Sequence, residues 1–322
     1  MGGKSILKVV LTDLLLKSLE ILFKYLCIMK MKLSQRLMLK YYKAKIRTIG
    51  MVSPEKAAAE AFDLFSTPFK SKKNPKIPPV FHQSLPVSVE VRGITIRGFQ
   101  WKSELAQARK VLIVHGFSSY SYKFEQYIVS LKKEGFEVLA FDAPGHGISD
   151  GKKINALIYR DTILAIESNF GPLYGIIAHS MGGLAAALAM ELMTNTKERK
   201  LVLIAPATET KRAIENLFTQ IPVKPIVRQA FDQYVTNLAG KPISYFSVAR
   251  VVRTLDARVL WIHDETDAIC TFEDVAPLLN ETIPSTEFII TKGLGHNQVY
   301  KEASSRDHIL SFIQSPAKGD FL

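Results

Sequence analysis

The chain has 322 residues, of which 47% are hydrophobic and 22% charged. This length suffices for one large globular domain or two smaller ones, and the composition excludes an intrinsically disordered protein. Two cysteines far apart in the sequence, Cys27 and Cys270, exclude a disulfide framework and favour a reducing, cytoplasmic location. The net charge is +12, and residues 1–50 contribute +9 of it through eleven Lys or Arg against two acids. Attraction to an anionic partner is therefore expected from this N-terminal segment.

The N-terminal segment is predicted to be helical over residues 5–47. Polar residues at Asp13, Lys17, Glu20 and Lys24 recur at intervals of three and four within an otherwise apolar sequence. Charged residues interrupt the apolar runs, so neither a membrane-spanning helix nor a signal peptide is expected. Three alternatives stay open: a helix packed on the rest of the protein or on a second copy, a helix lying on an anionic membrane surface, or a cleaved targeting segment. A nucleic-acid-binding arm is not expected, because the basic residues are dispersed among apolar ones.

A second helix is predicted to begin at Ser53-Pro54-Glu55 and to end before Pro68, since serine caps helices and proline favours their first position. The Lys- and Pro-rich stretch from Phe69 to Pro79 is typical of a linker. We therefore divide the chain into a basic amphipathic leg (1–50), a helix with a linker (51–79) and a large domain (80–322).

The large domain shows alternating strand and helix patterns, which predict an α/β fold with a mostly parallel sheet and helices on both of its faces. A hairpin around Arg92-Gly93 places antiparallel strands at its beginning. Strands are expected at 87–91, 94–101, 111–114, 136–141, 175–178, 201–204, 259–262 and 287–290, and helices at 123–133, 155–169, 183–193, 272–279 and 301–314. The alternation stops over about 206–255, where two or three helical segments predict an insertion that caps the functional site.

The stretch from Leu173 to Met190 carries the strongest functional signal. An apolar run of strand length leads to Ala178-His179-Ser180-Met181-Gly182-Gly183, and an alanine-rich helical segment follows at once. This is typical of a nucleophile elbow, a tight strand-to-helix turn that exposes a serine hydroxyl and requires small neighbours. Ala178 replaces the usual first glycine of the pattern. The alternative is an inactive relative that keeps the turn for packing.

A nucleophilic serine requires a base and an acid that orients it, and both are expected after later strands. His296 lies in a glycine-flanked loop after the last strand. Carboxylates follow the strand that ends at His263, and both Asp264 and Asp267 are candidates. The remaining six histidines are expected to make structural hydrogen bonds or to lie in linker and helix positions: His82, His115, His146, His179, His263 and His308. Asp142 is expected to be structural.

An oxyanion hole is also required, because negative charge develops on the carbonyl oxygen during attack by the serine. His115-Gly116-Phe117 follows the third strand. The backbone N–H groups of Phe117 and of Met181, directly after the serine, are the expected donors.

From about Val87 to Gln314 the chain resembles the α/β-hydrolase fold enzymes, most closely their bacterial esterase, lysophospholipase and monoacylglycerol-lipase-like branch. The motifs are His115-Gly116-Phe117, the segment 142–149 (DAPGHGIS), the segment 178–183 (AHSMGG), the segment 263–267 and Gly295-His296. The resemblance implies a triad in which Ser180 is the nucleophile, His296 the base and Asp267, rather than Asp264, the acid.

The resulting expectation is a serine hydrolase that cleaves carboxylic esters without a cofactor. Lipid-like esters gain support from the basic leg and from apolar residues of the insertion. An aminopeptidase, a thioesterase and a non-catalytic binding protein of the same fold remain alternatives. The glycines from Gly145 to Gly151 miss the spacing of a dinucleotide-binding loop, and no histidine pair has the helical spacing of metal ligands.

Overall fold

The computed structural model describes residues 33–68 and 75–316, which form two compact units. Within the described residues, the smaller unit comprises residues 33–61 and 218–231, and the larger comprises 62–217 and 232–316. The predicted helix over 5–47 lies largely outside the described residues, as does most of the predicted linker. The domain boundaries expected from the sequence stay predictions.

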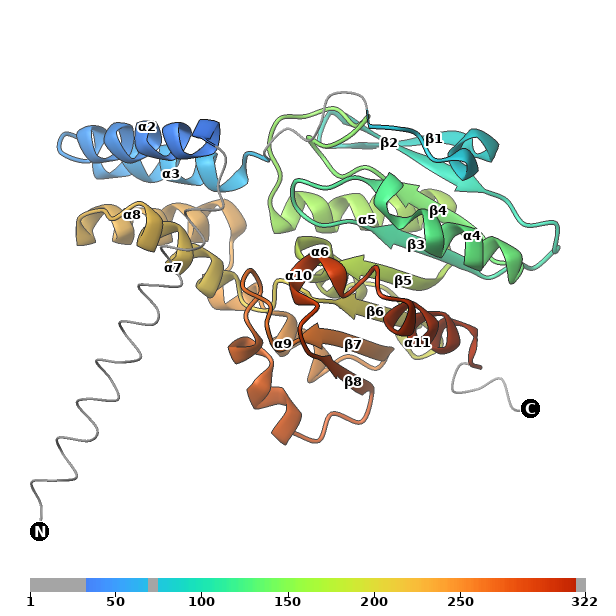
Figure 1. The fold of residues 1–322 in the computed structure, drawn as a ribbon. Helices are drawn as coiled ribbons and strands as arrows, with labels where there is room; N and C mark the ends of the chain where they lie inside the picture. Colours follow the sequence, from blue (N-terminus) through green and yellow to red (C-terminus); the bar gives the residue numbers. More distant parts are fainter. Residues whose placement is uncertain (1–32, 69–74, 317–322) are drawn as a thin grey trace, which may run out of the picture. The chain divides into compact units, whose positions relative to one another are not determined.

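The larger unit is built on an eight-stranded sheet in the order β1-β2-β4-β3-β5-β6-β7-β8 (Figure 1). β2 is antiparallel to both of its neighbours, and every pairing from β4 to β8 is parallel. The strands are β1 Leu85–Val91, β2 Ile94–Trp101, β3 Lys110–Val114, β4 Glu137–Phe141, β5 Leu173–His179, β6 Lys200–Ile204, β7 Arg258–Asp264 and β8 Thr286–Thr291. The predicted α/β-hydrolase architecture, with antiparallel strands first, is confirmed.

Alternate side chains of the strands pack into two separate apolar cores, because successive residues of a strand face opposite sides of the sheet. Leu112 and Val114 belong to the core that includes α5, α6 and α9. Val111 and Ile113 belong to the core that includes α4 and α11. The inner strands are therefore buried on both faces, which explains why they read as continuous apolar runs.

The helices of the described chain mostly follow the expected pattern. They are α2 Leu33–Ile49, α3 Pro54–Ser66, α4 Glu125–Lys133, α5 Ala156–Phe170, α6 Met181–Met190, α7 Thr210–Gln220, α8 Pro225–Ala239, α9 Val248–Val252, α10 Gly295–Gln298 and α11 Ala303–Gln314, with 3₁₀ segments at Pro79–Gln83, Ser121–Phe124, Thr196–Glu198, Ile243–Tyr245, Phe272–Asp274 and Ala276–Asn280. The insertion between β6 and β7 holds α7, α8 and α9, as predicted.

The helix predicted over 272–279 is wrong. The segment forms two 3₁₀ turns, in which Val275 N–H donates to the carbonyl of Phe272 and Leu278 N–H to that of Val275. Pro277 has no N–H to donate and its ring restricts the preceding residue, so a continuous α-helix is disfavoured there.

The smaller unit contains α2, the first part of α3, and residues 218–231, which are the end of α7, the link to α8 and the first half of α8. Gly50, just after α2, lies where a Cβ would be 2.9 Å from Val227 Cγ2 and 3.4 Å from Ala57 Cβ, so the three segments approach closely. Lys45 Nζ pairs with Glu60 across α2 and α3 at 2.6 Å. Of the helices in the described ranges, none combines the length and apolar character needed to cross a membrane.

Candidate active site

Ser180 occupies a strained turn between β5 and α6. Its backbone has φ 56° and ψ −124°, a region that residues with a side chain rarely adopt. Ser180 N–H donates to Ile204 O at 3.0 Å, and Ser180 O accepts from Gly183 N and Ala207 N at 2.9 and 3.0 Å. These bonds to the next strand, to the following helix and to the loop after β6 hold the serine in a conformation that it would not adopt alone.

Small residues surround the turn because backbone groups pass close to it. A Cβ on Gly116 would lie 2.9 Å from Ser180 Cβ, and one on Gly182 would lie 2.5 Å from His115 O. A Cβ on Gly183 would lie 2.8 Å from Pro206 Cβ. Ala178 is one of the interior strand positions of β5 and is fully buried, so its methyl group is accommodated where the usual pattern has glycine.

Ser180, His296 and Asp267 form a continuous hydrogen-bonded series. The Ser180 hydroxyl lies 3.0 Å from His296 Nε2, and His296 Nδ1 lies 2.7 Å from Asp267 Oδ2. With a proton on Nδ1, His296 donates to Asp267 and leaves Nε2 free to accept the serine proton. The three sequence-predicted residues therefore meet at the carboxyl ends of β5, β7 and β8.

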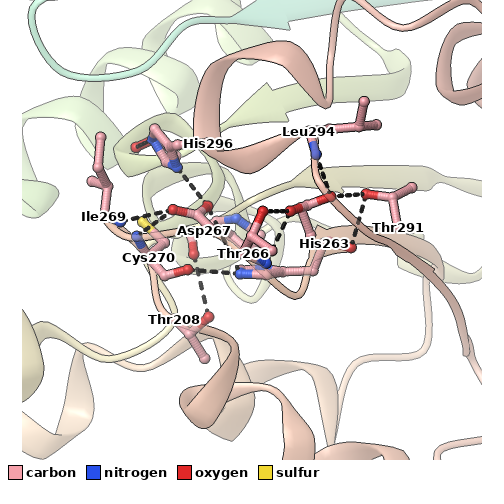
Figure 2. Close-up of polar contacts among 12 residues, drawn as sticks. Thr208, His263, Thr266, Asp267, Ile269, Cys270, Thr291, Leu294 and His296 are labelled. Atoms are coloured by element: carbon pink, nitrogen blue, oxygen red, sulfur yellow. Dashed lines mark hydrogen bonds and ion pairs between the residues drawn. The ribbon is translucent and has the colours of Figure 1, made fainter. Parts of the chain in front are cut away.

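Asp267 is held by more than the histidine, as Figure 2 shows. The backbone N–H groups of Ile269 and Cys270 donate to Asp267 Oδ1 at 2.8 and 3.0 Å. His263 Nε2–H donates to the carbonyl of Cys270 at 2.7 Å and so secures the same loop. One carboxylate oxygen thus fixes the loop, and the other is left to face the imidazole of His296.

Asp264, the alternative acid, has a different set of partners. Thr266 N–H donates to its Oδ1 at 2.9 Å, and Thr291 Oγ1 and Leu294 N–H donate to its Oδ2 at 2.8 and 2.9 Å. Burial opposes ionisation of this carboxyl, but these hydrogen bonds outweigh it and lower its pKa. Asp264 therefore ties the loop that carries His296 to the end of β7, and its oxygens bond Thr266, Thr291 and Leu294 rather than the imidazole.

His179, directly before Ser180, anchors the backbone of His296. Its Nε2–H donates to the carbonyl oxygen of His296 at 3.0 Å, and the two rings have centroids 4.7 Å apart. Burial lowers the pKa of His179 to about 3, with a smaller contribution from neighbouring His296, so the ring is neutral at neutral pH. The expected structural role of this histidine thus has a specific form that the sequence pattern alone did not reveal.

The expected oxyanion donors lie beside the serine. Gly116 lies against Ser180, and Phe117 is the next residue along the chain. Met181 is the first residue of α6, where backbone N–H groups have no partner within the helix. Among residues 33–68 and 75–316, neither the Phe117 nor the Met181 N–H donates to a protein acceptor. Two backbone donors beside Ser180 are what an oxyanion hole would require.

Two further histidines hold the loop that carries Phe117. His115 Nε2 accepts from Ala143 N–H, and His146 Nε2 accepts from Ser118 N–H, both at 2.9 Å. Burial lowers the pKa of both rings, that of His146 to about 4, which keeps the accepting nitrogens unprotonated. Asp142 accepts from Ser121 and Ile148 N–H at 2.8 and 3.0 Å, in agreement with its expected structural role.

Most apolar residues of the insertion that could have contacted a lipid chain are internal. Ile221, Phe231 and Phe246 are buried, and Phe218 packs edge-on against Phe231 with centroids 5.0 Å apart. Ile226 and Leu238 are the large exposed ones, at 57% and 52% of their surface. These side chains therefore serve the packing of the insertion and carry little argument for a lipid substrate.

The sheet order, the strained serine between β5 and α6 and the loops after β7 and β8 define an α/β-hydrolase. Residues 106–275, more than half of the chain, match the family described as serine aminopeptidase, S33. The chain belongs to this family of hydrolases.

Curated relatives match only part of the chain. A Mycoplasma pneumoniae protein, named as an inferred esterase/lipase 2, is 27% identical over 122 residues, which cover 34% of this chain and 45% of that protein. A Mycoplasma genitalium protein, named as an inferred esterase/lipase 3, is 30% identical over 99 residues, 30% of this chain and 36% of its own. The chain thus spans less than half the length of these relatives.

Solved structures share the fold at low sequence identity. An esterase of Pyrococcus furiosus superposes with a TM-score of 0.57 at 19% identity, covering 78% of this chain and 99% of its own. An esterase of Exiguobacterium antarcticum gives a TM-score of 0.53 at 18% identity, covering 72% of this chain and all of its own. At this identity the likeness establishes the fold.

Proposed function

We propose that this hydrolase cleaves carboxylic esters through an acyl-enzyme formed on Ser180. The observation that carries the proposal is the hydrogen-bonded series from Asp267 through His296 to the Ser180 hydroxyl. Beside it lie two backbone donors that bond no acceptor in the part of the chain that the structure describes. The esterase and lipase names of the relatives support an ester as the bond that is cleaved.

In the proposed reaction, Ser180 Oγ attacks the ester carbonyl carbon while His296 Nε2 takes the hydroxyl proton. The N–H groups of Phe117 and Met181 stabilise the oxyanion of the tetrahedral intermediate. When the intermediate collapses, His296 gives its proton to the departing alcohol and the acyl group stays on Ser180. Water, deprotonated by His296, then releases the acid and restores the serine. Asp267 keeps the imidazole in the required tautomer and stabilises its charged form.

An aminopeptidase is the second candidate, because the matched family carries that description. A peptide N-terminus would require a free carboxylate near the site, and the insertion offers Glu209, which accepts a hydrogen bond from Ser247 Oγ at 2.5 Å. Burial raises the pKa of Glu209, so it is a weaker partner for an amine than an exposed carboxylate. Glu209 therefore gives the aminopeptidase little support.

The test is a panel of p-nitrophenyl esters, thioesters and aminoacyl anilides of graded acyl length, with Ser180→Ala as the blank. Ester hydrolysis that exceeds hydrolysis of the matched anilides and is lost in Ser180→Ala is expected. Anilide hydrolysis in preference to esters would favour the aminopeptidase, and activity that survives Ser180→Ala would reject the proposed nucleophile.

A further inference from the structure

The outward face of α2 combines cations with exposed apolar side chains. Leu37 and Tyr41 expose 58% and 61% of their surface, and Met51 and Val52 in the following turn expose 68% and 89%. The opposite face of the helix is occupied, since Ile46 is fully buried there. Single exposed apolar side chains are ordinary, whereas several of them grouped on one face are typical of a surface that another molecule or a membrane covers.

Basic residues lie along the same outward face. Arg36, Lys40, Lys43 and Arg47 follow at intervals of three and four, next to Leu37 and Tyr41. α2 contains no acidic residue, and none of these four cations forms an ion pair with an acid in the described parts of the chain. Lys45, by contrast, points to Glu60 on the packed side. The face is thus basic and apolar without neutralising charge.

A hollow of about 630 Å³ adjoins this face within the smaller unit. Lys43, Arg47 and Lys224 contribute three cations to its lining, Met51 and Val223 contribute apolar surface, and no acid lines it. Three cations around an apolar hollow provide charge for a phosphate group together with a place for the adjoining hydrocarbon.

Charge is segregated between the two units of the chain. Residues 1–61 and 218–231 carry +10 of the net +12, which leaves +2 for all remaining residues. Repulsion between like charges disfavours a second copy placed face to face on this basic surface.

We propose that the outward face of α2 with its adjoining turn and hollow docks on an anionic phospholipid surface. The cations bind headgroup phosphates, and Leu37, Tyr41 and Met51 enter the boundary between headgroups and acyl chains. A nucleic acid would satisfy the charges but would leave these three side chains exposed. The inference does not depend on ester hydrolysis, because it concerns binding by the smaller unit.

The test is co-sedimentation of the full-length chain with phosphatidylcholine vesicles containing 0 or 30% phosphatidylglycerol. Binding is expected only to the anionic vesicles and should weaken as salt increases. The triple variant Lys40→Gln/Lys43→Gln/Arg47→Gln should lower the partition coefficient on the order of 100-fold, since each cation near such a surface contributes roughly a factor of five. Leu37→Ser/Tyr41→Ser/Met51→Ser should weaken binding without changing the charge.

The matched control is Lys102→Gln/Lys133→Gln/Lys152→Gln, which removes the same charge from exposed positions of the larger unit and should leave binding largely intact. Circular dichroism melting and hydrolysis of a soluble ester establish that each variant is folded. An equal loss of vesicle binding in the Lys40/Lys43/Arg47 variant and in the control variant, or equal binding to both kinds of vesicle, would overturn the proposal. So would duplex DNA binding without vesicle binding, or self-association that the Leu37/Tyr41/Met51 variant abolishes.

Discussion

The strained backbone of Ser180 predicts that glycine at this position gives a more stable protein than alanine. Both substitutions remove the hydroxyl and its bond to His296, so their difference isolates the backbone and the Cβ. A side-chain-bearing residue at φ 56° and ψ −124° costs about 1–3 kcal/mol, which glycine avoids. Glycine destabilises the folded protein by about 0.5–1 kcal/mol relative to alanine, because its unfolded chain has more conformational entropy. The expected net gain of Ser180→Gly over Ser180→Ala is therefore about 1 kcal/mol, with a range of about 0–2.5 kcal/mol.

The assay is denaturant unfolding of the two variants followed by circular dichroism, with the free energies of unfolding compared. Ala187→Gly, in the ordinary helical backbone of α6, is the control and is expected to lose about 1 kcal/mol or more. If Ser180→Gly were less stable than Ser180→Ala by a similar amount, the turn would not be strained and the reasoning would be refuted.

Three further predictions concern the loops around the site. Asp267→Asn should lower kcat for a soluble ester about 10⁴-fold, whereas Asp264→Asn should mainly lower Tm. Steady-state kinetics and thermal melting of the two variants distinguish these effects. His179→Phe should lower kcat roughly 5- to 100-fold with little change in KM, because it leaves the carbonyl of His296 without its buried donor. His179→Gln offers a donor at a similar reach and should recover part of the loss. Equal kcat in both variants would contradict the anchoring role. The free energy of unfolding should fall as the pH drops from about 6.5 to about 4, because His146 binds a proton in the unfolded chain but not in the folded one, where its pKa is lowered to about 4. This single group accounts for about 3 kcal/mol of the fall. In His146→Gln, denaturation over this pH range should show a dependence of the unfolding free energy on pH that is smaller by about one proton.

Sequence patterns predicted the sheet well because its inner strands are buried on both faces. Val111–Val114 reads as an uninterrupted apolar run for that reason, and the small residues around Ser180 reflect the close approach of Gly116 and Gly182 to neighbouring backbone. These features depend on local spacing and burial, which the sequence records directly.

Long-range geometry could not be predicted in the same way. Asp264 and Asp267 both follow β7, and only the loop conformation turns one toward His296 and the other toward Thr291 and Leu294. The bond from His179 to the carbonyl of His296 joins residues 117 positions apart. No local pattern reports such a contact. The four-residue helix α10 around His296 was likewise missed, since it is too short to produce a periodic signal.

The smaller unit illustrates the same limit. The approach of Val227 to Gly50 associates part of the insertion with the N-terminal helices, although more than 150 residues separate the two positions. Composition identified the basic character of the N-terminal segment. It did not indicate that Lys224, from the insertion, completes the same basic hollow.

The central claim is that Ser180 is an activated nucleophile, and active-site labelling tests it most directly. The full-length protein is treated with a fluorophosphonate, and the modified peptide is located by mass spectrometry. The account predicts one label per chain on Ser180, slower labelling in Asp267→Asn, and none in Ser180→Ala or in denatured protein. A folded protein that remains unlabelled, or that is labelled at another residue, would contradict it.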